Sequence, residues 1–388
     1  MTEMIPYGRP YIDAEDITAV EAVLRSDWLT QGPAVERFER CVADYVGAKF
    51  ACAVNSATSA LHLACRAVGL GPGDRVWTVP NTFVASANAA LYCGASVDFV
   101  DIDPRTCNLS VAALAEKLAV AERKSLLPKA LVAVHFAGLS CDMAQIAELA
   151  RHYRFRVIED AAHAIGGEYQ GHKIGNCAHS DTTVFSFHPV KIITSGEGGM
   201  LLTNDPRLHK AVSLLRSHGV TRDPALMDRA PEGDWYYQQI DLGFNYRLTD
   251  LHAALGISQL RRIDEFVARR RALADRYDRL LADLPVIRAP RDTKGNSAWH
   301  LYVIQIDQQR TNKGRRQVFD AMRCAQILVN VHYIPVHLQP YYRRFGFAPG
   351  DYPAAEAYYE NAITLPLYAS MTDEQQERVV AVLKDALA

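Results

Sequence analysis

Apolar segments with strand character alternate with helical segments through the middle of this chain of 388 residues. Parallel strands need crossover connections, usually helices that cover the sheet, so few folds fit this alternation. We therefore predict an α/β fold with a large, mostly parallel sheet covered by helices. Strands are expected at 51–54, 75–80, 96–103, 129–138, 156–162 and 182–188, and helices between them at 59–70, 83–94 and 143–153.

The pattern changes near residue 248. Residues 249–284 carry apolar side chains at helical spacing over several turns, which predicts a long connecting helix. Beyond it, strands are expected at 300–306 and 327–336, and helices at 315–325 and 372–387. We therefore predict a large domain over 1–250, followed by the connecting helix and a smaller α+β domain over 251–388.

Charge and cysteine content argue against several classes of protein. The net charge is −2, from 42 basic and 44 acidic residues, and no like-charge block suggests a nucleic-acid surface. The eight cysteines form no CxxC pair, so we expect reduced thiols in a cytoplasmic protein. The N-terminal residues lack the apolar core of a signal peptide, and no apolar run reaches the roughly 18 residues of a membrane span.

Lys191 lies in the segment SFHPVKIITSGEGGM (186–200), just after a predicted strand. A lysine that forms a Schiff base must be held rigidly and partly desolvated beside a flat cofactor. The glycines that follow allow the backbone to approach a ligand closely. Taken alone, Lys191 fits an ordinary surface residue better, because most lysines are solvated.

Asp160 ends the apolar predicted strand RVIED, at the carboxyl edge of the sheet, where α/β proteins bind ligands. Pyridoxal phosphate (PLP) needs a carboxylate against its pyridine nitrogen, because that charge keeps the nitrogen protonated. An aspartate after a strand is equally suited to cap a following helix, and both interpretations stay open at the level of the sequence.

Small polar residues from Ser56 to Ser59 follow the strand at 51–54 and open a predicted helix. A helix N-terminus suits a phosphate dianion, and hydroxyls of Thr58, Ser59 and Ser186 can add hydrogen bonds. A plain helix cap is the commoner use of such residues. Phe83, between a strand and a helix, is placed either to stack on a cofactor ring or to pack in the core.

The segment 331–344 is rich in aromatic and basic residues. Such a surface suits a nucleotide diphosphate, although a solvated loop with one packed tyrosine fits the pattern equally well. We expect the segment to face a nucleotide sugar and to stay apart from the residues that hold the cofactor. His332 and His337 have no acidic or cysteine partners at ligand spacing nearby, so we expect no metal site.

Several motifs occur in a fixed order along nearly the whole chain. They include NSATSALHLA (55–64), VIEDAAHAIGGEY (157–169), SFHPVKIITSGEGGM (186–200) and LGFNYRLTDLHAALG (242–256), with further segments at 26–39, 82–89, 100–104 and 216–219. Together they resemble the DegT/DnrJ/EryC1/StrS family of sugar aminotransferases. The resemblance implies the fold-type I architecture of PLP enzymes, and a homodimer whose active sites lie at the subunit interface.

The resemblance also implies roles for individual residues. Lys191 matches the Schiff-base lysine, Asp160 the partner of the pyridine nitrogen, and His163 a residue near the phenolic oxygen of the cofactor. The phosphate-binding positions are Ala57, Thr58, Ser59 and Ser186, with Asn245 lent by the neighbouring subunit, and Phe83 is the stacking ring. The family's dehydratase branch has histidine in place of the lysine, so Lys191 favours transamination.

Within the family, the tail 331–368 is most similar to enzymes of pseudaminic acid biosynthesis. These transfer the amino group of L-glutamate to C4 of a UDP-linked 4-keto-6-deoxy N-acetylated hexose, with the cofactor alternating between PLP and pyridoxamine phosphate (PMP). The implied substrate-side positions are Tyr7, Asp27, Trp28, Leu29, Thr30, Val331, His332, Tyr333, Ile334 and Arg343. Alternatives are another nucleotide-sugar 4- or 3-aminotransferase such as a perosamine-type enzyme, a dehydratase or decarboxylating enzyme of the same fold, and a non-catalytic regulator.

Overall fold

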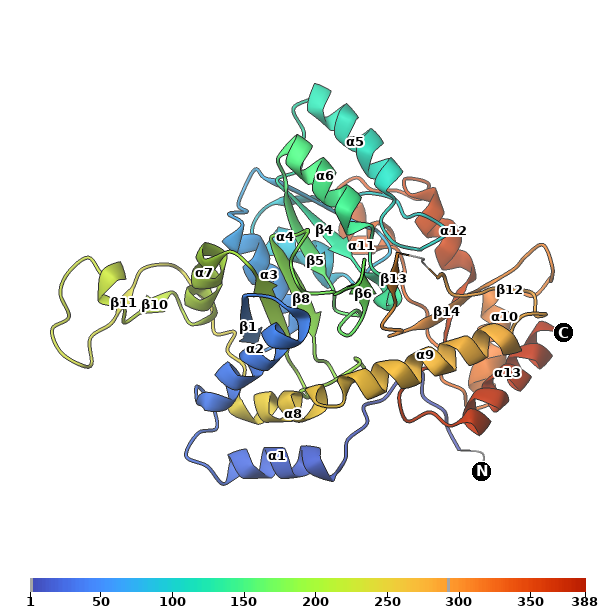
Figure 1. Cartoon of the computed structure of the whole chain (residues 1–388). Coiled ribbons are helices and arrows are strands. Elements are labelled where there is room, and N and C mark those ends of the chain that lie inside the picture. Colours follow the sequence, from blue (N-terminus) through green and yellow to red (C-terminus); the bar gives the residue numbers. More distant parts are fainter. Residues whose placement is uncertain (1–2, 292–293) are drawn as a thin grey trace.

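The central sheet has seven strands in the order β1-β9-β8-β5-β4-β2-β3 (Figure 1). The computed structural model describes residues 3–291 and 294–388. The strands are β1 (Phe50–Val54), β2 (Arg75–Thr78), β3 (Ser96–Phe99), β4 (Ala130–Val134), β5 (Arg156–Asp160), β8 (Thr182–Ser186) and β9 (Gly199–Thr203). Among these seven, β9 alone runs in the direction opposite to the other six. The predicted α/β fold with a large, mostly parallel sheet is confirmed.

Both faces of this sheet are covered, since every residue of β4, β8 and β9 is buried although alternate side chains point to opposite faces. The helices of this part of the chain are α1 (Ala14–Leu24), α2 (Pro33–Val46), α3 (Ala57–Ala67), α4 (Ala85–Tyr92), α5 (Val111–Arg123), α6 (Met143–Tyr153), α7 (Pro206–Arg216), α8 (Asp250–Leu260) and α9 (Ile263–Leu280). Ser56, Ser110 and Thr249 cap α3, α5 and α8, because each side chain accepts the backbone N–H three residues on. Among the described residues, no helix is long and apolar enough to cross a bilayer.

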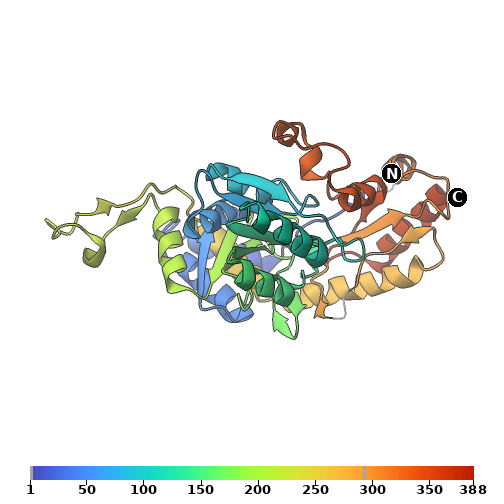
Figure 2. The same ribbon diagram turned by 90° about the horizontal axis from the view of Figure 1, so that it is seen from above.

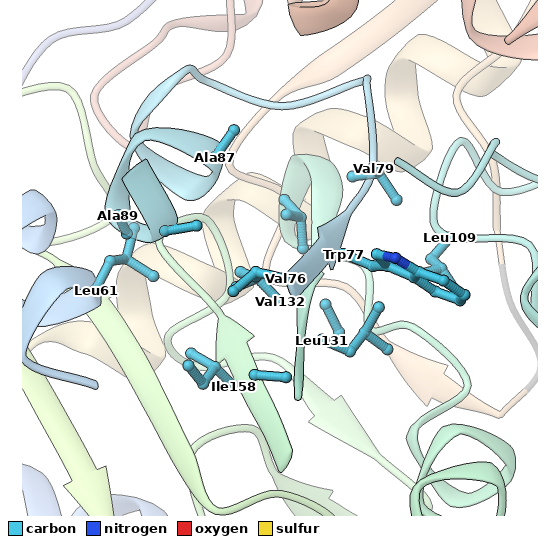
Figure 3. Packing of buried hydrophobic residues seen from close by; sticks show 14 of the residues in the cluster. Leu61, Val76, Trp77, Val79, Ala87, Ala89, Leu109, Leu131, Val132 and Ile158 are labelled. Atoms are coloured by element: carbon cyan, nitrogen blue, oxygen red, sulfur yellow. The ribbon is translucent and has the colours of Figure 1, made fainter. Parts of the chain in front are cut away.

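The core beside the sheet is built from neighbouring strands and the helices packed on them (Figure 3). Trp77, Val132 and Ile158 come from β2, β4 and β5, and each is at most 2% exposed. Leu61 of α3 and Ala89 of α4 belong to the same cluster. Full burial of one large apolar side chain stabilises the fold by about 1.5–3 kcal/mol, so this cluster fixes the strand ends that carry the polar residues of the site.

The predicted connecting helix is in fact two helices, α8 and α9, with a break at Arg261 and Arg262. At the break, the Arg262 guanidinium contacts the carboxylates of Asp13 and Asp16, each at 2.5 Å, where α1 begins. The chain turns where it docks on α1, and this long-range contact overrides the continuous helical pattern. In Figure 1, α9 then runs from the large sheet toward the C-terminal part of the chain.

A second, smaller core lies in that C-terminal part. Its antiparallel sheet contains β12 (Val286–Ile287), β14 (Tyr302–Ile306) and β15 (Ala362–Leu365), and α10 (Arg315–Cys324) and α13 (Asp373–Leu387) pack with it. The helix α9 contributes Phe266 and Val267 to a core of the large sheet, and Leu273 and Tyr277 to the smaller core. The boundary at 250/251 stays a prediction, and this packing puts the change of core within α9.

The predicted strand at 327–336 is not formed. This segment makes only isolated bridges, from Ile327 to Ile5 and from Asn330 to Thr364. The edge position beside β14 belongs to β15 instead. The segment then turns through a loop containing Pro335, which has no N–H to donate to a sheet. Its apolar, β-branched residues resemble a strand, but they serve to bring residues 330–333 to the cavity described below.

An arm projects from the large sheet between α7 and α8. It contains the short antiparallel pair β10 (Val220–Thr221) and β11 (Gln238–Gln239), and both views show it extending away from the rest of the chain (Figures 1 and 2). Trp235 on the arm and Leu242 at its base are each 71% exposed. Large apolar side chains grouped in this way on a projection are typical of a surface that contacts another protein.

Candidate active site

A cavity of about 460 Å³ opens at the carboxyl edge of the sheet. Val134, Asp160 and Ser186, the last residues of β4, β5 and β8, lie in its wall. This is the edge where parallel sheets bind ligands. Of the predicted site residues, the cavity brings together Tyr7, Ala57, Thr58, Phe83, Asp160, His163, Ser186, Lys191, Val331, His332 and Tyr333.

Lys191 lies in the wall of this cavity, on the loop that follows β8. Its backbone N–H donates to the carbonyl of His188 at 2.9 Å, and the adjoining Ile192 and Ile193 are buried in the core. Burial lowers the pKa of the Lys191 amine to about 8, and the Asp160 carboxylate opposes part of that shift. The chain therefore has a constrained, partly desolvated lysine here, unlike most lysines.

Asp160 is buried at the end of β5 and is held by two donors. The Ser86 hydroxyl donates to Oδ2 at 2.6 Å, and the backbone N–H of Ala162 donates to Oδ1 at 3.2 Å. Ser86 in turn lies 2.7 Å from the Thr82 hydroxyl. Residues 162–166 form turns and not a helix, so the alternative interpretation of Asp160 as a helix cap is wrong. The carboxylate is fixed facing the cavity.

The N-terminus of α3 forms another part of the wall, with Ser56, Ala57 and Thr58 at the cavity. The backbone N–H groups of Ala57 and Thr58 belong to the first turn, which has no intrahelical acceptors. Ser59 turns away, because its hydroxyl donates to Asn55 and its N–H to the Ser56 cap. Gly199 of β9 braces this turn: a Cβ there would lie 2.5 Å from the Ser56 carbonyl. The arrangement fits an anion at the helix end.

His163 is a neutral hydrogen-bond donor in this site. Its Nδ1 accepts the backbone N–H of Ala137 at 3.3 Å, so the ring proton belongs on Nε2, 3.1 Å from the Tyr333 hydroxyl. Burial lowers the pKa of His163 well below 6.5, and Lys191 and His332 lower it further. The expectation that segment 331–344 stays apart from the predicted cofactor residues is therefore wrong for Tyr333.

Phe83 is 59% exposed and lies in the cavity wall, so it is not a core residue. Its ring is 6.3 Å from that of Tyr333, centroid to centroid, at an angle of 52°. The ring is therefore available to stack on a flat ligand.

A comparison with families of known proteins decides which family this chain belongs to. The description of the DegT/DnrJ/EryC1/StrS aminotransferase family matches residues 10–384. The chain belongs to this family.

Individual relatives agree with this family assignment. SpsC of Bacillus subtilis (strain 168), a spore coat polysaccharide biosynthesis protein, is 41% identical over 385 residues, which are 98% of this chain and 96% of the relative. PseC of Helicobacter pylori, an aminotransferase involved in the biosynthesis of pseudoaminic acid, matches with a TM-score of 0.90 and 31% identity over 99% of both chains. Spr1654 from Streptococcus pneumoniae, solved in PLP and PMP forms, matches with a TM-score of 0.89 and 29% identity over 99% of this chain and 98% of that one.

As a member of the DegT/DnrJ/EryC1/StrS family, this protein is a PLP-dependent sugar aminotransferase. The cavity fits that cofactor on its own evidence. It offers a lysine whose pKa is lowered to about 8, a buried carboxylate held by Ser86, and a helix N-terminus for a phosphate. Lys191, Asp160 and the first turn of α3 are the groups that would hold it.

Other positions matched to the DegT/DnrJ/EryC1/StrS family lie outside this cavity. Trp28 lies in an open groove of about 830 Å³ between α1, α2 and α8, and Thr30 bridges to Thr249. Ile334 is 46% exposed, and Arg343 ends the short helix α11 (Pro340–Arg343). Asn245 bridges to Ser217, beside the start of α3. The roles of Asp27, Trp28, Leu29, Thr30, Ser59, Asn245, Ile334 and Arg343 stay predictions.

Some residues of the cavity were not predicted from the sequence. His300 and Asn330 lie in the wall. Ser86 is buried behind the wall, where it bonds Asp160 from α4, and the one available signal was a hydroxyl on a largely apolar helix. His300 and Asn330 belong to segments interpreted as strands, and they follow Asp160 by 140 or more residues along the chain. The strand pattern gave no indication that their side chains reach the same cavity.

The lowered pKa of Lys191 predicts how PLP capture depends on pH. Protein stripped of cofactor should take up PLP about tenfold faster per pH unit below a pKa of about 8, because only the neutral amine attacks an aldehyde. Above that pH the rate should level off. Stopped-flow absorbance after mixing with PLP would measure this. A rate that keeps rising to the ordinary lysine pKa of 10.5 would contradict the expectation.

Proposed function

We propose that this enzyme transfers the amino group of L-glutamate to C4 of a UDP-linked 4-keto-6-deoxy N-acetylated hexose, in pseudaminic acid biosynthesis. The observation that carries the proposal is Lys191 near Asp160 in one cavity, in a chain that matches PseC of Helicobacter pylori over 99% of its length. A cytoplasmic location accords with the eight cysteines, all of which lie in the described part of the chain and are free of disulfides.

The residues of the cavity divide the chemistry among them. Bound PLP supplies the electron sink that stabilises a carbanion at the substrate. The Lys191 amine, neutral above about pH 8, removes the Cα proton of the amino donor and returns a proton in the second half of the reaction. The Asp160 carboxylate, fixed by Ser86, would keep the ring nitrogen of the cofactor protonated. The Nε2–H of His163 donates to the Tyr333 hydroxyl, so it would reach a phenolic oxygen by exchanging that bond, and the exposed ring of Phe83 would stack on the cofactor.

The phosphate would lie at the N-terminus of α3. Ala57 and Thr58 offer backbone N–H groups there, and the hydroxyls of Thr58 and Ser186 add donors from two directions. Ser59 contributes through the cap that orients this turn. On the substrate side, Tyr7, Val331, His332 and Tyr333 would contact the sugar from the wall that the C-terminal part and the N-terminal segment supply.

The best test supplies the sugar directly. The PMP form of the enzyme should be incubated with 4-keto nucleotide sugars that differ in nucleotide, in N-acetylation and in configuration at C5. We expect the UDP-linked, N-acetylated 4-keto-6-deoxy hexose to regenerate the PLP absorbance fastest, with an amine at C4 of the product by NMR. Preference for a sugar without the N-acetyl group, or for another nucleotide, would overturn the substrate assignment.

A second candidate is another nucleotide-sugar 4- or 3-aminotransferase. It is favoured by the 41% identity to SpsC, which exceeds the 31% identity to PseC and belongs to a protein of spore coat polysaccharide biosynthesis. Adding 3-keto nucleotide sugars to the panel separates the two candidates, because the amine replaces the keto oxygen and a 3-aminotransferase would therefore use only the 3-keto sugars.

The enzyme is also proposed to be a homodimer with shared active sites. In one chain, Lys191 is the only lysine at the cavity, and no arginine is among the described residues that line it. A phosphate and a nucleotide diphosphate need more positive charge than this. The exposed arm between α7 and α8, with Trp235 and Leu242, is suited to reach a second copy of the chain.

Mixing two inactive variants tests the shared site. Asn245→Ala and Lys191→Ala proteins should regain up to about a quarter of wild-type activity after subunit exchange, because half of the dimers are mixed and one site in each is intact. Activity should be measured before and after mixing, with exchange followed by mass spectrometry of tagged subunits. Two variants that exchange subunits yet gain nothing would show that Asn245 does not serve the partner.

Tyr333 and Arg343 should differ in which half-reaction they affect. Tyr333→Phe removes the hydroxyl bonded to His163, so both half-reactions should slow, by about tenfold for one lost hydrogen bond. Arg343 is the last residue of α11 and lies outside the cavity lining, so Arg343→Ala should slow only the half-reaction with the keto sugar. Single-turnover absorbance with L-glutamate and with the sugar measures each half. An Arg343→Ala enzyme impaired equally in both halves would show that this helix supports the fold and not the sugar.

A further inference from the structure

The imidazole of His300 lacks a hydrogen-bond partner among the described residues, although the residue is only 4% exposed. Its Nδ1 is enclosed by protein. Because His300 lines the cavity, Nε2 is the ring nitrogen that reaches the ligand space. Buried polar groups without partners are rare in native proteins, and one that opens on a binding cavity indicates a group that the ligand satisfies.

Several contacts hold His300 in place. Its backbone N–H donates to the Ala137 carbonyl at 2.9 Å, and its carbonyl accepts from the Arg270 guanidinium at 3.2 Å. Its ring lies 4.4 Å from that of His163, centroid to centroid. The preceding residue, Trp299, has a φ of +52°, which is strained for a residue other than glycine. A residue whose backbone is held this firmly, and whose ring is left unbonded, is pre-organised for a ligand.

The ring of His300 acts as a neutral donor. Burial lowers its pKa well below 6.5, and His163 and Lys191 lower it further. A neutral imidazole carries a single ring proton. On Nδ1 that proton would be a buried donor without an acceptor, which is rarer in proteins than an unsatisfied acceptor. The proton therefore belongs on Nε2, directed at the cavity.

The chemistry of the cavity points to the ligand. An amino-acid donor brings its α-carboxylate close to Lys191, because this lysine must reach the adjacent Cα. No arginine is among the described residues that this chain contributes to the wall, so within one chain the carboxylate meets neutral N–H groups. Resting on the proposed function, we propose that the Nε2–H of His300 binds the α-carboxylate of the amino donor and determines its affinity.

The test compares two variants of similar size. His300→Gln keeps an N–H donor, and His300→Met does not. The probe is 2-oxoglutarate, which binds the PLP form without reacting, and its dissociation constant is measured by calorimetry on the holoenzyme. We expect His300→Met to weaken binding at least about tenfold and His300→Gln to stay within about threefold of the wild type, as for a hydrogen bond to a charged group.

Two further measurements identify which ligand His300 binds. UDP affinity should be the same in all three proteins, whereas a loss for UDP instead of 2-oxoglutarate would overturn the assignment to the amino donor. His209→Met, which replaces a ring stacked on Phe50 outside the cavity, is the control and should bind both probes normally. Unchanged 2-oxoglutarate affinity in His300→Met would also overturn the proposal.

A last experiment uses the wild-type enzyme, so its result does not depend on how well the variants fold. In wild-type enzyme labelled with ¹⁵N-histidine, 2-oxoglutarate should move one imidazole N–H proton signal downfield, and no such shift would count against the proposal. A wild-type enzyme that neither reacts with L-glutamate nor binds 2-oxoglutarate would instead overturn the proposed amino donor, and this inference with it.

Discussion

Lys191→Ala is expected to slow both half-reactions by about 10⁴-fold or more, because it removes the nucleophile and the proton-transfer group together. The side chain makes no hydrogen bond among the described residues, and Ile192 and Ile193 anchor the loop, so the fold should survive. Single-turnover absorbance with L-glutamate and with the keto sugar would measure the two rates.

Chemical trapping makes this expectation specific. Borohydride should fix the cofactor to the wild-type chain at Lys191, and peptide mass spectrometry should find no adduct in Lys191→Ala. Lys210→Ala, which removes an exposed lysine on α7, is the matched control and should retain both the rate and the adduct. An adduct on a different lysine of the wild-type protein would remove the central assignment.

Asp160→Asn should slow both half-reactions by about 10² or more, or roughly 3 kcal/mol in the barrier, because the ring nitrogen loses the charge that keeps it protonated. The amide can still accept from the Ala162 N–H and donate to the Ser86 hydroxyl, so the local structure should be retained. The measurement is again single-turnover absorbance, together with the pH dependence of the cofactor band.

A neighbouring carboxylate provides the control for Asp160. Glu159 lies one residue earlier on β5, so its side chain points to the opposite face, where it bonds His135 and Thr183. Glu159→Gln should lower the melting temperature without altering the cofactor band. If Glu159→Gln slowed catalysis as much as Asp160→Asn, the effect of Asp160 would be structural. A nearly normal rate in Asp160→Asn would show that this carboxylate does not serve the cofactor.

The parts of the fold that local pattern determines were predictable. The strands that become β1, β2, β3, β4, β5 and β8 are short apolar runs between turn residues, and each was expected close to where it lies. The antiparallel β9 was not expected, because its residues follow the glycines that had been assigned to the Lys191 loop. Asp160 and Lys191 could be predicted since strand ends in parallel sheets converge on one edge.

Contacts between distant parts of the chain could not be predicted in the same way. The bond from Ser86 to Asp160 depends on how α4 packs on α3, β2 and β3, and the approach of Tyr333 to His163 depends on a segment whose apolar pattern resembles a strand. The position of His300 at the cavity could not be predicted for the same reason. In each case tertiary packing, and not local propensity, decides the direction of the side chain.

The helix α9 has a consequence for how the enzyme loses its structure. One half of this helix is buried in a core of the large sheet through Phe266 and Val267, and the other half in the smaller core through Tyr277. Unwinding either half would expose apolar surface that the other core needs. We therefore expect cooperative denaturation of both cores together, and a gene cut after codon 250 to encode a chain that aggregates.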